Sequence, residues 1–173
     1  MSTIEHCQGF PAQVNDQCTV LLLGSMPGIA SLQAAQYYAH PRNRFWPLMG
    51  ALCGFDPGLP YAQRLRALQD SGGGLWDVIG QCQRRGSLDA HIVRGSEVPN
   101  ALPPLLAGLP RLQLVGCNGG AAFQAWQRFI APQLANPPTV LALPSTSPAN
   151  AGWSLPRLRT AWAPVAAALA TQR

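Results

Sequence analysis

Short apolar runs that end in glycine or polar residues alternate with stretches of mixed polarity along this chain. Three runs, at 18–23, 112–117 and 139–143, are rich in leucine and β-branched side chains and predict buried strands. A shorter apolar run at 75–79 predicts a fourth strand. Each run is too short for a helix that packs on its own, so these segments are expected to form one sheet.

Helices are predicted between and after these strands. The segment 59–71 places Tyr61, Leu65 and Leu68 on one face at helical spacing, and the glycines from Gly72 onward end it. The repetition of strand, loop and helix predicts an α/β fold, a three-layer α/β/α sandwich around a mainly parallel sheet of four to five strands. The other expected helices cover 29–36, 45–53, 103–108, 121–130 and 155–170.

Two segments show neither pattern. Residues 1–16 are expected to form an irregular N-terminal arm, and the polar, arginine-containing stretch 81–97 is expected to be a long surface loop. A chain of 173 residues is long enough for one domain with a substantial core. Since no repeat or linker interrupts it, we expect a single domain over 1–173.

Composition places the chain among compact globular proteins. The apolar fraction is 47% and the charged fraction 11%, and no apolar run approaches the roughly 20 residues that span a bilayer. The first 16 residues carry acids and no basic region, unlike a signal peptide. The five cysteines form no CxxC pair and match no common metal pattern, so we expect reduced structural thiols, no metal, no cofactor and a cytoplasmic location.

The formal net charge is +5, and every basic side chain is arginine. The absence of lysine excludes a P-loop, which needs its lysine, and excludes a side-chain Schiff base. A modestly basic surface of arginines suits partners that carry phosphates.

Polar loops follow three of the predicted strands, at 24–28, 118–120 and 144–150. The carboxyl ends of parallel strands lie at one edge of a sheet, so these loops are expected to converge on one pocket. Its candidate residues are rich in amides and hydroxyls: Ser25, Tyr38, His40, Asn43, Asn118, Ser145, Ser147 and Asn150.

The stretch 37–46 extends from the first of these loops and combines tyrosines, a His-Pro pair, an asparagine between two arginines, and Phe45-Trp46. Aromatic faces stack on bases and guanidinium groups bind phosphates, whereas Phe45 and Trp46 are expected in the core. Simpler interpretations stay open: Asn43 and Asn118 as turn residues, and the 145–150 loop as a helix-preceding segment.

Asp77 follows Trp76 at the end of an apolar run. Two interpretations of this carboxylate stay open, a general base or a buried group that anchors a loop.

These motifs together resemble the uracil-DNA glycosylase superfamily, over roughly 20–162. The Gly-x-x-Pro-Gly motif of that family matches 24–28, and its second motif matches 145–150. The string 39–46 is similar to the mismatch-specific uracil/thymine branch. With Gly-Ser-Leu-Asp at 86–89 added, the combination is most similar to the hypoxanthine-DNA glycosylase branch.

One position departs from the mismatch-specific pattern. Met26 stands where those enzymes have their catalytic asparagine, and a thioether cannot position a water. The resemblance to the hypoxanthine branch implies Asn43 and Asn118 as catalytic residues. It further implies that Tyr38 stacks on the base and that Ala149 matches an apolar wedge, for which alanine is small. The implied base-binding residues are Ser25, Met26, Tyr38 and Asn118, and the implied DNA-binding residues are His40, Arg42, Arg44, Ser145, Thr146, Ser147, Ala149 and Asn150.

The function implied is a monofunctional glycosylase that hydrolyses the N-glycosidic bond of a flipped-out deaminated base, hypoxanthine in particular, and leaves an abasic site. The partner is double-stranded DNA with such a base, and the protein is expected to be a monomer that needs no membrane. Three alternatives stay open: a uracil or mismatch glycosylase, a non-catalytic DNA-binding module, and an α/β enzyme with Ser25 or Ser145 as nucleophile. No G-x-S-x-G elbow supports the last.

Overall fold

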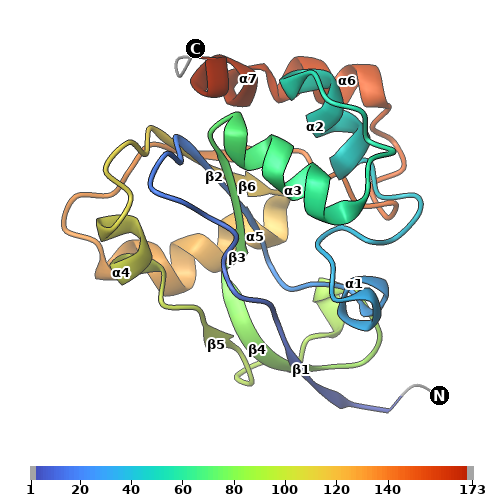
Figure 1. The fold of residues 1–173 in the computed structure, drawn as a ribbon. Helices are drawn as coiled ribbons and strands as arrows, with labels where there is room; N and C mark the ends of the chain where they lie inside the picture. Colours follow the sequence, from blue (N-terminus) through green and yellow to red (C-terminus); the bar gives the residue numbers. More distant parts are fainter. Residues whose placement is uncertain (1–2, 171–173) are drawn as a thin grey trace.

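Four parallel strands form the central sheet, in the order β3-β2-β6-β7. The structure is a computed structural model that describes residues 3–170, and Figure 1 shows the strands running side by side through its centre. This confirms the predicted parallel sheet. The strands are β2 (Val20–Gly24), β3 (Gly73–Asp77), β6 (Leu114–Asn118) and β7 (Val140–Leu143).

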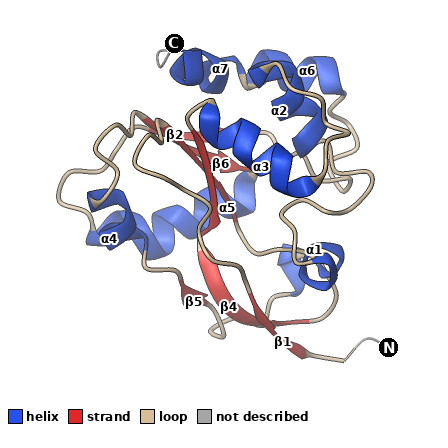
Figure 2. Cartoon of the chain, in the orientation of Figure 1, coloured by secondary structure: helices blue, strands red, loops and turns tan. Residues whose placement is uncertain are grey.

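Helices cover both faces of this sheet, which confirms the three-layer α/β/α architecture (Figure 2). The first face packs against α4 (Leu102–Ala107), α5 (Gly120–Ala125) and the π-helical turn η2 (Trp126–Ile130). The opposite face packs against α2 (Phe45–Cys53), α3 (Tyr61–Asp70), α6 (Leu155–Ala161) and α7 (Ala163–Ala170).

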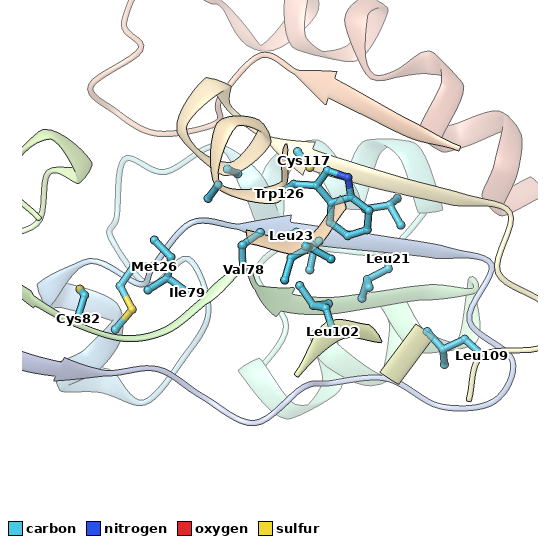
Figure 3. Packing of buried hydrophobic residues seen from close by; sticks show 14 of the residues in the cluster. Leu21, Leu23, Met26, Val78, Ile79, Cys82, Leu102, Leu109, Cys117 and Trp126 are labelled. Carbon is cyan, nitrogen blue, oxygen red and sulfur yellow. The ribbon is translucent and has the colours of Figure 1, made fainter. Parts of the chain in front are cut away.

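Strand β2 is apolar throughout because it is buried on both faces. Leu21 and Leu23 point into the first layer with Leu102 and Trp126 (Figure 3), where all four side chains are buried. The alternate side chains of β2, Val20 and Leu22, point to the opposite face, into the second helical layer, where they lie in one cluster with Phe45 and Trp162. A central parallel strand therefore reads as a continuous hydrophobic run, and full burial of each leucine contributes roughly 1.5–3 kcal/mol.

A second sheet, antiparallel and in the order β1-β4-β5, corrects two predictions. Within 1–16, of which residues 1–2 lie outside the described range, β1 (Glu5–Gln8) is an ordered strand. The expected loop 81–97 begins inside β4 (Ile79–Arg84), and β5 (Val98–Pro99) follows it. Backbone pairing stabilises these strands, and their polar side chains gave no period-2 apolar signal.

Two predicted helices are interrupted. The segment 121–130 changes from α5 to the wider η2 at Trp126. The segment 155–170 divides at Trp162, directly before α7, where Pro164 lacks the N–H that a continuous helix requires. The remaining short elements are α1 (Ile29–Ala34), η1 (Asp89–His91) and η3 (Ala131–Gln133). Over the described part of the chain, no helix is long and apolar enough to cross a bilayer.

All five cysteines are buried, as expected of structural thiols. Burial raises the pKa of the Cys18 and Cys117 thiols to about 12 and that of Cys82 to about 11. These three groups are therefore protonated at neutral pH and behave as small hydrophobic side chains.

Phe45 is a central residue of the second layer, with no exposed surface and ring contacts to Tyr38, Trp46 and Trp162. We expect Phe45→Ala to lower the free energy of unfolding by about 3–5 kcal/mol because it leaves a cavity in a packed core. Urea unfolding measures this change. Leu88→Ala is the control, since Leu88 is 49% exposed; equal losses in both variants would contradict the assignment.

Candidate active site

A cavity of about 190 Å³ opens at the carboxyl edge of the parallel sheet. The three loops predicted to converge all contribute to its wall, together with residues 87–89. Strand register explains this convergence, because Gly24 is paired with Asp77 and Asn118 with Leu143 at neighbouring strand ends. The site-residue candidates that line the cavity are Ser25, Met26, Tyr38, His40, Asn43, Asn118, Ser145, Thr146 and Ser147.

Gly24 allows two polar side chains to meet at the floor of this cavity. A Cβ atom there would lie 2.5 Å from Asp77 Oδ1 and 3.4 Å from the Tyr38 hydroxyl. The first distance is shorter than van der Waals contact permits, so a side chain at this position would displace the Asp77 carboxyl group. The Gly-x-x-Pro-Gly motif therefore begins with a residue whose missing side chain makes room for a carboxyl group and a phenol.

Asp77, at the end of β3, is 4% exposed. Its Oδ2 atom has no hydrogen-bond partner among the described residues. Burial, reinforced by the nearby Asp89 and opposed by Arg84, raises the pKa of Asp77 to about 8. A carboxyl group that is mainly protonated at neutral pH does not fit the general-base interpretation.

Tyr38 has a left-handed backbone, with a φ of 55°. Its neighbours hold it there: Ser31 Oγ accepts from Ala39 N, and Trp46 Nε1 donates to the Tyr37 carbonyl. One face of the Tyr38 ring stacks on Phe45 at a centroid distance of 4.0 Å and an interplanar angle of 16°. The Tyr38 hydroxyl is buried without a well-formed hydrogen bond to the described residues, and burial raises its pKa.

Thr146 connects the two candidate catalytic amides. Its hydroxyl donates to Asn43 Oδ1 at 2.9 Å and accepts from Asn118 Nδ2 at 3.0 Å, and its backbone N donates to Asn118 Oδ1 at 3.0 Å. Asn43 Oδ1 also accepts from the backbone N of Phe45 at 2.9 Å. Two donors therefore occupy the Asn43 carbonyl oxygen, and its NH₂ group is the part that remains for a ligand.

The two arginines beside Asn43 differ in their surroundings. Arg42 is exposed, whereas Arg44 Nη2 donates to the carbonyls of Ser147 and Asn150 at 2.8 and 3.0 Å. Arg44 thus fixes the second-motif loop against the stretch 37–46, and Arg42 is the guanidinium that is open to solvent.

Side-chain hydrogen bonds also fold the second-motif loop on itself. Ser145 Oγ accepts from Ser147 N, Ser147 Oγ accepts from Ala149 N, and Asn150 Nδ2 donates to the Ser145 carbonyl. Both serine hydroxyls keep a hydrogen to donate. Ala149 is exposed at the outer end of the loop, and it lies with Asn150 outside the central cavity.

The first-motif residues divide between cavity and core. Ser25 Oγ donates to Asp89 Oδ1 at 2.6 Å, which ties the turn to the 86–89 segment. Although Asp89 is exposed as a residue, its carboxyl group faces inward, and this burial raises its pKa. Met26 lies with Ile79 and Cys82 in the core (Figure 3), and only part of it reaches the cavity.

Several site features were not foreseen. The sequence patterns indicated a pocket of amides and hydroxyls, whereas two carboxyl groups, those of Asp77 and Asp89, also line it. Thr146 was expected to contact DNA, and its bridge between two amides was not predicted. The strand-end position of Asp77 in 73–77 was the available signal, because neighbouring strand ends share one edge. Among the residues that the structure describes, no group of three or more His, Cys, Asp or Glu side chains could hold a metal.

The comparisons with known proteins agree with this fold. The family model described as "Uracil DNA glycosylase superfamily" matches residues 11–167, and the chain belongs to this family. Within it, the chain is similar to a hypoxanthine DNA glycosylase of Methanosarcina barkeri (strain Fusaro / DSM 804), with 41% identity over 113 residues, 65% of this chain and 70% of the relative.

Two proteins of Methanosarcina acetivorans extend the comparison. A hypoxanthine DNA glycosylase from this organism is 37% identical over 116 residues, which cover 66% of this chain and 72% of the relative. The solution NMR structure of a candidate uracil DNA glycosylase superposes with a TM-score of 0.80 at 31% identity. That match covers 95% of this chain and 99% of the other, so the fold is shared over nearly the whole length.

Thr146→Val tests the bridge between the amides. Valine keeps the size of the fully buried side chain but removes the hydroxyl that serves Asn43 and Asn118. We expect a loss of about 1–3 kcal/mol in the free energy of unfolding, because buried polar groups lose their partner. Thr146→Ser should retain most of the stability in the same urea titration. Equal stability of the valine variant and the wild type would show that the bridge contributes nothing.

Asp77→Asn tests the protonation of Asp77. The folded-state pKa of about 8 lies above the ordinary value of 3.8, so only the unfolded chain releases the proton between these values. Wild-type stability should therefore fall by up to about 1.4 kcal/mol for each pH unit across this window and level off above it. The amide that replaces the carboxyl group cannot titrate. The difference in Tm between Asp77→Asn and the wild type should therefore shift in favour of Asp77→Asn as the pH rises from 5 to 8.5, measured by circular dichroism in one buffer series. A Tm difference that does not change with pH would refute the shifted pKa.

Proposed function

We propose that this protein is a hypoxanthine DNA glycosylase that hydrolyses the N-glycosidic bond of deoxyinosine in duplex DNA and leaves an abasic site. The observation that carries the proposal is the pairing of Asn43 and Asn118 through Thr146 in a cavity floored by Tyr38 and Asp77. Its relatives named hypoxanthine DNA glycosylase support the same activity.

The cavity suits a planar base that has left the DNA stack. The stacking of Tyr38 on Phe45 leaves its other face for a base, and base–aromatic stacking contributes about 1–3 kcal/mol. Asn118 uses one N–H and its oxygen on Thr146, which leaves a second N–H for an acceptor on the base edge. Ser25 and Met26 complete the wall on the opposite loop.

Hydrolysis requires a water at the sugar carbon while the bond to the base breaks, through an oxocarbenium-like state. We assign the placement of this water to Asn43. Because donors occupy its Oδ1 atom, Asn43 would hold the water through N–H donation, which leaves a lone pair of the water for attack. Asn43 would thus orient the water without deprotonating it.

We assign DNA binding to residues around the mouth of the cavity. Arg42 is exposed beside the cavity, His40 lines it, and Ser145 and Ser147 keep hydroxyl hydrogens for phosphate oxygens. Arg44, Thr146 and Asn150 would act indirectly by shaping the loop. We assign to Ala149, exposed in the same loop, the position of the wedge that would enter the duplex. A chain without lysine has no side-chain amine for a lyase step, so the activity is monofunctional.

We further propose that the protein works as a monomer in the cytoplasm. Buried thiols at Cys7, Cys18, Cys82 and Cys117 fit a reducing compartment.

Uracil is the second candidate base. The NMR structure described as a candidate uracil DNA glycosylase supports it, whereas Met26 removes the amide that the mismatch-specific branch uses. A uracil-containing duplex therefore belongs in every assay.

Substitution of either amide tests the assignment. Duplex oligonucleotides with a single deoxyinosine, uracil or xanthine are incubated with enzyme, and abasic sites are scored by alkaline cleavage. We expect Asn43→Ala and Asn118→Ala each to lower the single-turnover rate of hypoxanthine release at least about 100-fold. Removal of one preorganised polar group from an active site usually has an effect of this size.

The matched control is Asn136→Ala, an exposed asparagine outside the cavity, which should retain wild-type activity. Full activity of Asn43→Ala would remove it from the chemistry, and tight binding without base release by the wild type would identify a DNA-binding module. Cleavage of the strand without alkali would contradict a monofunctional enzyme.

A further inference from the structure

The cavity contains one acidic group that the proposed function has not yet used. Asp77 lines the cavity and is 4% exposed, yet its Oδ2 atom has no hydrogen-bond partner among residues 3–170. The hydroxyl of Tyr38 is buried nearby, beside the Asn118 side chain. Buried polar atoms nearly always have partners in folded proteins, so the unsatisfied carboxyl oxygen of Asp77 at the cavity floor indicates that a bound ligand completes it.

Strand pairing fixes the backbone position of Asp77 at the edge of the sheet. Asp77 is the last residue of β3, paired in register with Gly24, and its carbonyl accepts a 2.7 Å hydrogen bond from Asn100 Nδ2. The absent Cβ at Gly24 provides the space in which Asp77 Oδ1 lies. A ligand in the cavity would therefore meet the Asp77 carboxyl group at the cavity wall.

We propose that Asp77 is a catalytic residue that carries a proton in the resting enzyme and donates it to the leaving base. This inference rests on the proposed function, since it needs a base as ligand. A protonated carboxyl group supplies one donor, whereas an ionised one would repel the negative charge that grows on the base as the bond breaks.

The charged and titratable groups around Asp77 set its protonation. The pKa of Asp77 is raised to about 8: burial has the largest effect, the neighbouring Asp89 adds to it, and Arg84 of β4 opposes it. Tyr37 and Tyr38 lie near the carboxyl group in the loop after α1, and burial, with a smaller contribution from Asp77, raises the pKa of both phenols. These phenols are neutral across the working range. His40 is the other titratable side chain that lines the cavity.

The proposed step balances as follows. The bond between the sugar C1′ and the base nitrogen breaks, and its electron pair moves into the base. The proton of Asp77 moves to an acceptor nitrogen or oxygen of the base, which leaves as a neutral molecule. The water held by Asn43 adds to C1′ through its oxygen and releases one proton to solvent, and Asp77 regains a proton from solvent after the base departs. The net reaction consumes one water and needs no other reactant.

The test is the pH dependence of hypoxanthine release from a deoxyinosine duplex, measured in single turnovers from pH 6 to pH 10. We expect the wild-type rate to fall about tenfold for each pH unit above about 8, as the donor loses its proton. Asp77→Asn should be at least about 100-fold slower at pH 7, within the usual range for general acid catalysis, and should lose the alkaline decrease. His40→Asn should keep the alkaline decrease, which assigns it to Asp77.

A merely structural role predicts a different outcome. If Asp77→Asn lost activity through misfolding, its Tm and its affinity for a duplex with an abasic-site analogue would fall too; we expect that affinity to stay within about twofold of the wild type. An Asp77→Asn enzyme as fast as the wild type at pH 7, or one with an unchanged alkaline decrease, would overturn the proposal.

A measurement without substrate separates this inference from the proposed function. Carbon-13 NMR of the side-chain carboxyl groups follows Asp77 directly, with Asp77→Asn identifying its signal. The signal should titrate near pH 8 in the free protein. Titration near pH 4 would refute the proton donor even if the wild type releases hypoxanthine. A wild type that releases no base while Asp77 titrates near pH 8 would refute the proposed function instead.

Discussion

The hydrogen bonds of the Thr146 side chain hold the site together, because they connect segments that are far apart in the sequence. Asn43 belongs to the loop before α2, Asn118 ends β6, and Thr146 lies after β7. The hydroxyl has no exposed surface, so water cannot replace either contact cheaply. Each amide is thereby fixed in one orientation, with its oxygen occupied and an N–H available. The positions of the two amides thus depend on the packing of β6 beside β7.

The charge state of the acidic groups in the cavity is a second property on which the site depends. Two acids line the cavity, and burial raises the pKa of both carboxyl groups, that of Asp77 to about 8. A protonated Asp77 adds no negative charge at the cavity floor, whereas an ionised one would repel an electron-rich base. Arg84, wholly buried with Nη2 donating to the Pro27 carbonyl at 2.6 Å, supplies positive charge from behind the first-motif turn and limits the shift at Asp77.

Much of the fold could be predicted because local patterns and tertiary structure agree. Helix 45–53 was predicted with its observed bounds, and the apolar runs of β2 and β6 signalled strands buried on both faces. The antiparallel β1-β4-β5 sheet was missed because its strands are polar and depend on backbone pairing between distant segments. In the site, strand order explains which loops meet, but the protonation of Asp77 depends on burial and on Asp89, and neither is visible in a local motif.

The buried thiols have a practical consequence for work on this protein. Cys18, Cys82 and Cys117 remain protonated near neutral pH, and thiol-directed reagents react with the thiolate. A single cysteine introduced at the exposed Ala149 would thus react far faster than these three. A fluorophore or spin label at this position would then report on changes in the surroundings of this loop.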